Sequence, residues 1–264
     1  MRTIRSRENA HFKALRRLVD SSRERRKSGL SVLDGPHLVS VYADRVGAPA
    51  QLVLSFSGLA RREIRALADR LGASDAVVLS DTLFNEISPV VSPAGIIAVV
   101  ETPRPRTFPA RLEPCIMLED IRDPGNLGSI LRSAAATGIK QVFLSTTTVH
   151  AWSPRVLRAG MGAHFMLQLY EGVDLVAAID AFPGTVMAAS ATSTQSLFDA
   201  DVSGQVAFLF GNEGGGLSTT LRQKAHAEIA IPMPGGTESI NVAAAVAVCL
   251  FERVRQIGIA RYAS

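Results

Sequence analysis

Short apolar runs recur along the second half of this chain and alternate with longer segments of helical spacing. Residues 115–118, 141–144 and 206–210 are strand-like runs, whereas 127–137 and 241–257 have the length and apolar spacing of helices. Further strands are expected at 166–170, 186–189 and 229–231, and further helices at 154–161, 173–181 and 218–225. Asn126 stands where a helix N-cap is expected, and Gly138 where that helix stops. The alternation predicts an α/β fold whose parallel sheet is covered on both faces.

The first half shows a weaker form of the same alternation. A basic amphipathic helix is expected at residues 9–27, then strands at 31–33, 52–54, 77–79 and 96–100, with helices at 36–42 and 60–71. The segment TPRPRTFP, residues 102–109, holds three prolines, which favour extended chain and predict a linker. We therefore predict a small α/β domain at residues 1–105 and a larger one at residues 110–264.

Composition and charge narrow the class of protein. Hydrophobic residues make up 47% of the 264 residues, which is enough for a core. No apolar run is long enough to span a membrane, and the basic first residues lack an export signal, so a cytoplasmic protein without a membrane partner is expected. Cys115 and Cys249 lie in apolar runs, which predicts two reduced, buried thiols.

The net charge of +4 is unevenly distributed. Residues 1–107 carry 17 Lys and Arg against 11 Asp and Glu, whereas residues 108–264 carry 11 against 13. This excess fits an acidic partner bound by the first half, and it fits a solvated basic helix equally well.

Several common chemistries do not fit the sequence. The five histidines are scattered, with none at metal-ligand spacing, so no metal site is predicted. No G-x-S-x-G segment offers a nucleophilic serine. The segment FLFGNEGGGLS, residues 208–218, has the glycine spacing of a P-loop, but Leu217 replaces the lysine and Glu213 would repel phosphate. It also lacks the first G-x-G step of a dinucleotide-binding loop. Taken alone, this segment is either a ligand loop or a tight turn.

Three segments, in this order along the chain, carry a specific resemblance. DPGNLGSILRSA, LFGNEGGGLS and IPMPGGTESINVAAA resemble the three signature motifs of the SpoU (TrmH-like) RNA 2′-O-ribose methyltransferases of the SPOUT superfamily. The resemblance extends over residues 112–258. More loosely, DGPHLVSVYA and SPVVSPAGIIAVV resemble the family's small, ribosomal-protein-like RNA-binding domain, which gives residues 1–105 the role of binding the RNA substrate.

The resemblance implies a C-terminal trefoil knot that holds S-adenosyl-L-methionine, and a homodimer that uses the helix at residues 241–257. It implies the following cofactor-binding residues: Leu209, Gly211, Asn212, Gly214, Ile231, Met233 and Ile240. In two positions the chain departs from common members of the family, with Ala243 in place of Ser and Met161 in place of Ala. The first departure bears on one hydrogen bond near the cofactor, and the second on packing.

The implied reaction transfers a methyl group to a ribose 2′-OH, which must lose its proton. The resemblance assigns catalysis to Arg132, with Asn126 as its support, Glu213 in the active-site loop, and Ser239 and Asn241 as positioning residues. Arg132 as a base conflicts with the permanent charge of a guanidinium. Binding of a phosphate and stabilisation of the developing alkoxide is the other interpretation, and both stay open here.

The basic first half fits an RNA substrate. The candidate RNA contacts are Arg5, Arg7, Lys13, Arg16, Arg17, Arg25, Arg26 and Lys27. With its separate N-terminal domain, the chain resembles the rRNA-directed branch of the family more than its minimal tRNA enzymes, and this resemblance favours large-subunit rRNA over tRNA as the substrate. A protein of another class, an RNA-binding assembly factor that keeps the knot without the chemistry, is the remaining alternative.

Overall fold

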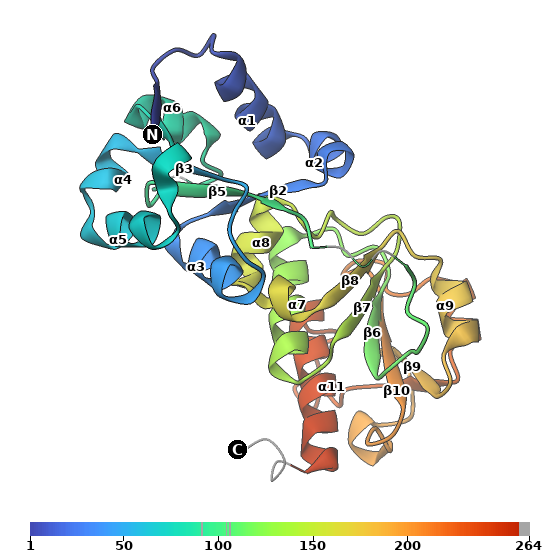
Figure 1. Ribbon diagram of the computed structural model, residues 1–264. Helices are drawn as coiled ribbons and strands as arrows, with labels where there is room; N and C mark the ends of the chain where they lie inside the picture. Colours follow the sequence, from blue (N-terminus) through green and yellow to red (C-terminus); the bar gives the residue numbers. More distant parts are fainter. Residues whose placement is uncertain (91, 104, 106, 259–264) are drawn as a thin grey trace. The chain divides into compact units, whose positions relative to one another are not determined.

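Two sheets, each with its own helices, organise the chain in the computed structural model, which describes residues 1–90, 92–103, 105 and 107–258 (Figure 1). The first unit comprises Met1–Pro103 together with Trp152–Phe165, and the second comprises Arg104–Ala151 together with Met166–Ser264. Arg104 and Arg106 of the predicted linker lie outside the described residues.

The sheet of the first unit has the order β1-β4-β3-β5-β2. Its strands are β1 (Arg2–Ile4), β2 (Leu30–Asp34), β3 (Gln51–Ser55), β4 (Val77–Leu79) and β5 (Ile96–Glu101). Only β5 runs against its neighbours, so the carboxyl ends of the other four strands share one edge. The helices of the unit are α1 (Ala10–Asp20), α2 (Ser22–Ser28), α3 (Pro36–Arg45), α4 (Phe56–Ala60), α5 (Arg62–Arg70), α6 (Asp81–Ile87) and α8 (Pro154–Gly160).

The first unit differs from the sequence predictions in one predicted helix, and in a strand and two α-helices that were not predicted. The single helix predicted at residues 9–27 is wrong, because Ser21 has extended backbone and caps α2 by accepting a hydrogen bond from the Glu24 backbone N–H. The helix predicted at 60–71 is confirmed as α5, and the short helix α4 that precedes it was not predicted. Strand β1 has no counterpart among the predicted elements, because it buries only Ile4 and so leaves no apolar run in the sequence. Helix α6 was not predicted either.

Residues 152–165 pack with the first unit, although the predicted division keeps them with residues 110–264. Helix α8 lies against β2. Phe165 meets Tyr42 edge to face with ring centroids 5.3 Å apart, and Trp152 lies 5.2 Å from the His164 ring.

The sheet of the second unit confirms the parallel α/β prediction. Its order is β11-β9-β10-β6-β7-β8, and every pairing in it is parallel. The strands are β6 (Cys115–Leu118), β7 (Gln141–Leu144), β8 (Gln168–Glu171), β9 (Thr185–Ala189), β10 (Val206–Phe210) and β11 (Ala227–Ile229). The helices are α7 (Pro124–Ala136), α9 (Leu175–Ala181), α10 (Thr219–Lys224) and α11 (Val242–Ile257). Three short 3₁₀ turns complete the described elements: Ala73–Asp75, Ala163–Met166 and Leu197–Asp199.

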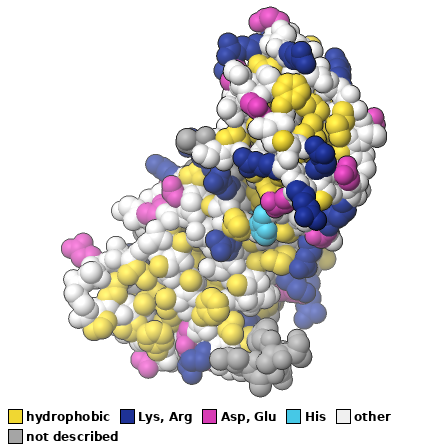
Figure 2. Space-filling view, turned by 90° about the vertical axis from the view of Figure 1, so that its left-hand side faces the viewer, with side chains coloured by type: hydrophobic (Ala, Val, Ile, Leu, Met, Phe, Trp, Pro, Cys, Tyr) yellow, Lys and Arg dark blue, Asp and Glu magenta, His cyan; other side chains and the backbone are white. Residues whose placement is uncertain are grey.

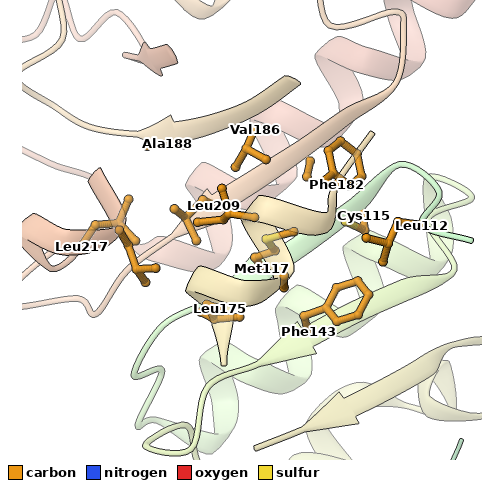
Figure 3. Packing of buried hydrophobic residues seen from close by; sticks show 14 residues of the cluster. Leu112, Cys115, Met117, Phe143, Leu175, Phe182, Val186, Ala188, Leu209 and Leu217 are labelled. Carbon is orange, nitrogen blue, oxygen red and sulfur yellow. The ribbon is translucent and has the colours of Figure 1, made fainter. Parts of the chain in front are cut away.

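The core of this unit explains why its central strands β6 and β10 are uninterrupted apolar runs. On one face, Met117, Phe143 and Leu209 pack with Leu175 of α9 and Leu221 of α10 (Figure 3). Side chains alternate along a strand, so Phe208 and Phe210 point to the opposite face, where both are buried. Helices α7 and α11 pack against each other (Figure 1). Covered on both faces, the sheet leaves its carboxyl edge as the place for ligands. In the described part of the chain, no helix is long and apolar enough to cross a membrane.

Candidate active site

Two loops leave the carboxyl ends of the neighbouring strands β6 and β10 and are tied together. The loop after β6 begins at Glu119, whose carboxylate accepts a 2.7 Å hydrogen bond from the Ser218 backbone N–H. The loop after β10 contributes Asn212, whose side-chain amide donates to the Asp120 carbonyl oxygen at 2.8 Å. The first and second sequence motifs therefore lie against each other at one edge of the sheet.

The glycine-rich loop is held in a tight turn. Asn212 and Gly216 exchange backbone hydrogen bonds of 3.1 and 2.8 Å. The Asn212 side-chain oxygen accepts from the backbone N–H groups of Gly214 and Gly215, at 2.8 and 3.3 Å. A Cβ atom on Gly211 would lie 2.2 Å from the Gly216 carbonyl oxygen and 2.3 Å from the Leu217 nitrogen. Only glycine permits so close a return of the backbone, which accounts for Gly211.

A cavity of about 400 Å³ opens beside this loop. Its apolar wall includes Phe210, Ile229, Ile231 and Val242, and its polar groups include Glu213, Glu238 and Ser239. This volume lies within the range of small-molecule sites, which combine an apolar wall with a few polar groups. The carboxylates suit a neutral or cationic ligand better than a phosphate.

Asn126 joins all three sequence motifs. Its side-chain N–H donates to the Glu213 carboxylate at 2.7 Å, and its side-chain oxygen accepts from the Asn241 amide at 2.9 Å. The Asn241 side-chain oxygen in turn accepts from the backbone N–H groups of Ala243 and Ala244, which caps α11. The start of α11 thus positions Asn241, and Asn241 fixes the orientation of the Asn126 amide.

The prediction that Asn126 caps the helix of the first motif is wrong. Helix α7 begins at Pro124, and Asp123 is its N-cap, accepting a 2.8 Å hydrogen bond from the Asn126 backbone N–H. Proline is favoured at the first helical position because its missing N–H has no partner there anyway. The Asn126 side chain lies one turn into the helix and is available to the site.

Asp120 and Arg122 are site residues that the sequence analysis missed. Asp120 has φ of 56°, which is uncommon for a residue other than glycine. Its carboxylate receives two contacts from the Arg122 guanidinium, at 3.0 and 2.9 Å. The hydrogen bond to Asp120 raises the pKa of Arg122, and the charge of Glu213 raises this pKa further. Both residues follow the parallel strand β6. That position was the signal in the sequence that could have identified them, since ligands bind at the carboxyl ends of parallel strands.

The cofactor residues that the resemblance implies are mostly found at the cavity. Six of them line it: Gly211, Asn212, Gly214, Ile231, Met233 and Ile240. Leu209 is not among the lining residues, because it is fully buried in the cluster that faces α9 and α10. Ser190, Glu238 and Cys249 line the cavity and were not predicted. Ser190 follows β9, the neighbour of β10, so the rule of carboxyl ends could have indicated it.

The catalytic residues that the resemblance implies are only partly brought together. Glu213 and Ser239 line the cavity, and Asn126 and Asn241 are bonded beside Glu213. Arg132 lies exposed on α7, and no described residue makes a hydrogen bond or an ion pair with its side chain. The Asn126 amide is bonded to Glu213 and Asn241 and makes no hydrogen bond to Arg132.

The basic residues predicted to contact RNA differ in their surroundings. Arg25 is only 4% exposed, and its guanidinium donates to the carbonyl oxygens of Leu18 and Val19, each at 2.7 Å. Burial lowers the pKa of Arg25, and its contacts give it a structural role at the end of α1. Three residues form surface ion pairs with acidic neighbours: Arg7, Lys13 and Arg16. Four are exposed and have no ion pair within the described chain: Arg5, Arg17, Arg26 and Lys27.

Figure 2 shows Lys and Arg side chains gathered over the visible face of the first unit. On the visible face of the second unit, Lys and Arg side chains are fewer and hydrophobic side chains are frequent. Within the described ranges, no three His, Cys, Asp or Glu side chains gather where they could hold a metal ion.

Comparisons with known proteins point in one direction. The model of the SpoU rRNA Methylase family matches residues 113–251. An uncharacterised tRNA/rRNA methyltransferase of Synechocystis is 33% identical, with 96% of this chain and 94% of that protein aligned. The 23S rRNA (guanosine(2553)-2′-O)-methyltransferase RlmP of Bacillus subtilis is 27% identical over 95% of this chain and 98% of its own. The crystal structure of an AdoMet-bound rRNA methyltransferase from Sinorhizobium meliloti superposes with a TM-score of 0.81, at 25% identity, over 97% of this chain and 98% of that one.

Proposed function

This chain belongs to the SpoU rRNA methylase family, and on that premise we propose that it transfers a methyl group from S-adenosyl-L-methionine to a ribose 2′-OH of large-subunit rRNA. The observation that carries the proposal is the linkage of Glu213, Asn126 and Asn241 beside a cofactor-sized cavity. The name of the Bacillus relative, which acts on 23S rRNA, supports this substrate over tRNA.

The cavity fits the proposed cofactor in its chemistry. Ile229, Ile231 and Val242 offer an apolar wall for the adenine ring, and the backbone around Gly211 and Met233 offers hydrogen-bonding groups at close range. Glu213 and Glu238 place negative charge at a site that would hold a positive sulfonium. When bound, the cofactor supplies an electrophilic methyl group.

The chain's own residues would prepare the ribose oxygen. Asn126 is held by two hydrogen bonds, so its amide is fixed before any substrate arrives, and Ser239 lines the same cavity. The N-terminus of α7 lies beside the glycine-rich loop, because Asn126 in its first turn is bonded to Glu213. The positive end of the helix dipole therefore favours negative charge there. We assign Arg132 to the neighbouring phosphate and the developing alkoxide, because a guanidinium keeps its charge and cannot accept the proton.

The proposal includes a knotted backbone. In support, residues 195–197 pair with Ala230 beyond the end of β11, and the Gln256 side chain of α11 receives a hydrogen bond from the Val202 backbone N–H. The segment between β9 and β10 is thereby flanked by two segments that follow it in the sequence.

The proposal also includes a homodimer formed through the second unit. Phe251 of α11 is 52% exposed, and Ala244 is exposed on the same helix, so α11 presents apolar surface. Sedimentation of the purified chain tests this part, and a monomer at micromolar concentration would remove it.

Mapping 2′-O-methylation in RNA from cells that lack this protein tests the function itself. Loss of one methylated nucleotide in large-subunit rRNA, restored by the purified chain and S-adenosyl-L-methionine, is the expected result. Loss in tRNA alone would move the assignment to a tRNA methyltransferase. A purified chain that binds cofactor and RNA but transfers no methyl group would instead be an assembly factor.

A further inference from the structure

Three parallel strands of the first unit end side by side. Ile4 of β1 and Ser55 of β3 are both in register with Leu79 of β4. The residues that follow them, Arg5, Phe56 and Ser80, therefore leave the sheet at the same level of its carboxyl edge.

Phe56 is an exposed aromatic ring at this edge. Phe56 is 40% exposed, whereas every other Phe, Tyr or Trp ring in the described part of the first unit is buried or half-buried. The ring is not needed to anchor α4. The Ser55 hydroxyl caps that helix at Gly58, and a Cβ on Gly58 would lie only 2.3 Å from the Gly95 carbonyl oxygen, so the helix is seated by its backbone.

Arg5 supplies a cation beside the ring. Its guanidinium carbon lies 5.8 Å from the centre of the Phe56 ring, and no described carboxylate forms an ion pair with it. The nearby Asp81 carboxylate accepts instead from the backbone N–H and the hydroxyl of Ser57. Because a cation–π contact at an exposed site is weak, Arg5 can exchange the ring for a phosphate.

We infer that this Arg5–Phe56 edge binds an unstacked base of single-stranded RNA, with the base stacked on Phe56 and the adjacent phosphate held by Arg5. The inference rests on the proposed function and adds to it a site for bases, where the basic helices alone would give only phosphate contacts. RNA-binding proteins recognise single strands by this combination of an aromatic platform and a neighbouring cation. A protein partner would be served by an apolar patch, whereas here the exposed Phe56 ring is accompanied by the positive charge of Arg5, for which no described carboxylate forms an ion pair.

The test measures binding of the full chain to a labelled single-stranded RNA of mixed sequence, roughly 12 nucleotides long, and to the same RNA with abasic riboses. We expect Phe56→Ala to weaken binding to the first RNA by about tenfold and to leave binding to the abasic RNA unchanged. Phe56→Trp keeps a ring and should retain the affinity. Arg5→Ala should weaken both and should lower the salt dependence of binding.

Matched controls come from the end of α3, which starts at this edge and runs away from it. Val46→Ala removes an exposed apolar side chain and Arg45→Ala an exposed cation, and neither should change the base-dependent part of binding. Equal affinity of wild type and Phe56→Ala for the base-bearing RNA overturns the inference. So does an effect seen only with ribosomal particles, which would assign the edge to a protein.

Methyl transfer is scored separately. A wild-type chain that shows the Phe56-dependent binding but methylates no rRNA would refute the proposed function and leave the base site standing. Methylation by a wild type whose RNA affinity does not depend on Phe56 would do the reverse.

Discussion

Replacing Gly211 with alanine tests whether the glycine-rich loop has to close on its own backbone to form the cofactor site. The new Cβ would lie 2.2 Å from the Gly216 carbonyl oxygen, more than 1 Å inside ordinary contact, and the obstacle is backbone that no rotamer change can move. The loop must therefore open. Opening breaks the two reciprocal hydrogen bonds between Asn212 and Gly216, and the loss of each costs about 1 kcal/mol.

For the loop to open, the steric cost of closing it around the new Cβ must exceed the roughly 2 kcal/mol that these two hydrogen bonds supply, so the closed, competent loop becomes the minor state. Each further ~1.4 kcal/mol of net closing cost lowers the apparent cofactor affinity tenfold, and we expect a loss of at least about tenfold. Calorimetric titration of S-adenosyl-L-methionine into Gly211→Ala measures this loss. Gly204→Ala, in the exposed turn before β10, is the control, because a Cβ there meets nothing within 4 Å, the backbone is not left-handed and the residue does not line the cavity. Its affinity should stay within about twofold of wild type. If Gly211→Ala bound the cofactor as tightly as wild type, the loop would not form the site as described.

Three further changes separate roles within the second unit. Asn241→Asp keeps the side-chain oxygen that caps α11 but removes the donor to Asn126, so turnover should fall at least tenfold while the free energy of unfolding changes by less than about 0.5 kcal/mol. Asn241→Ala should lose both contacts, with about 1 kcal/mol of stability; wild-type turnover in Asn241→Asp, with a loss only in Asn241→Ala, would assign the effect to the cap alone. Arg132→Ala should nearly abolish methyl transfer, with cofactor affinity within a few-fold of wild type and an unchanged melting temperature; calorimetric loss of cofactor binding would contradict this division of roles. Burial raises the pKa of Cys115 and Cys249 to about 12. Alkylation of both thiols by iodoacetamide at pH 8 should therefore be slow in the native protein and fast after unfolding. Added cofactor should slow the labelling further at Cys249 only, since that residue lines the cavity.

Local pattern was sufficient for most of the second unit. Its four central strands are largely buried on both faces, so each is a mainly apolar run that stands out in the sequence, as at residues 206–210. The start of α11 at Asn241 was also predictable, because capping depends on groups only two or three residues away. The glycine-rich segment alone could not be distinguished from a tight turn. Only its position between the other two motifs indicated that it binds a ligand.

Tertiary structure decided which polar groups meet. Asn126 contacts Glu213 and Asn241, which are 87 and 115 residues away, and no periodicity reports such distances along the chain. Arg25 looks like its exposed neighbours in a basic helix, yet the break at Ser21 turns it inward onto backbone carbonyl groups. A hydrophobic pattern specifies which face of an element is buried. The partner across that face depends on strand order and on loop closure, and these are settled only when the whole sheet has formed.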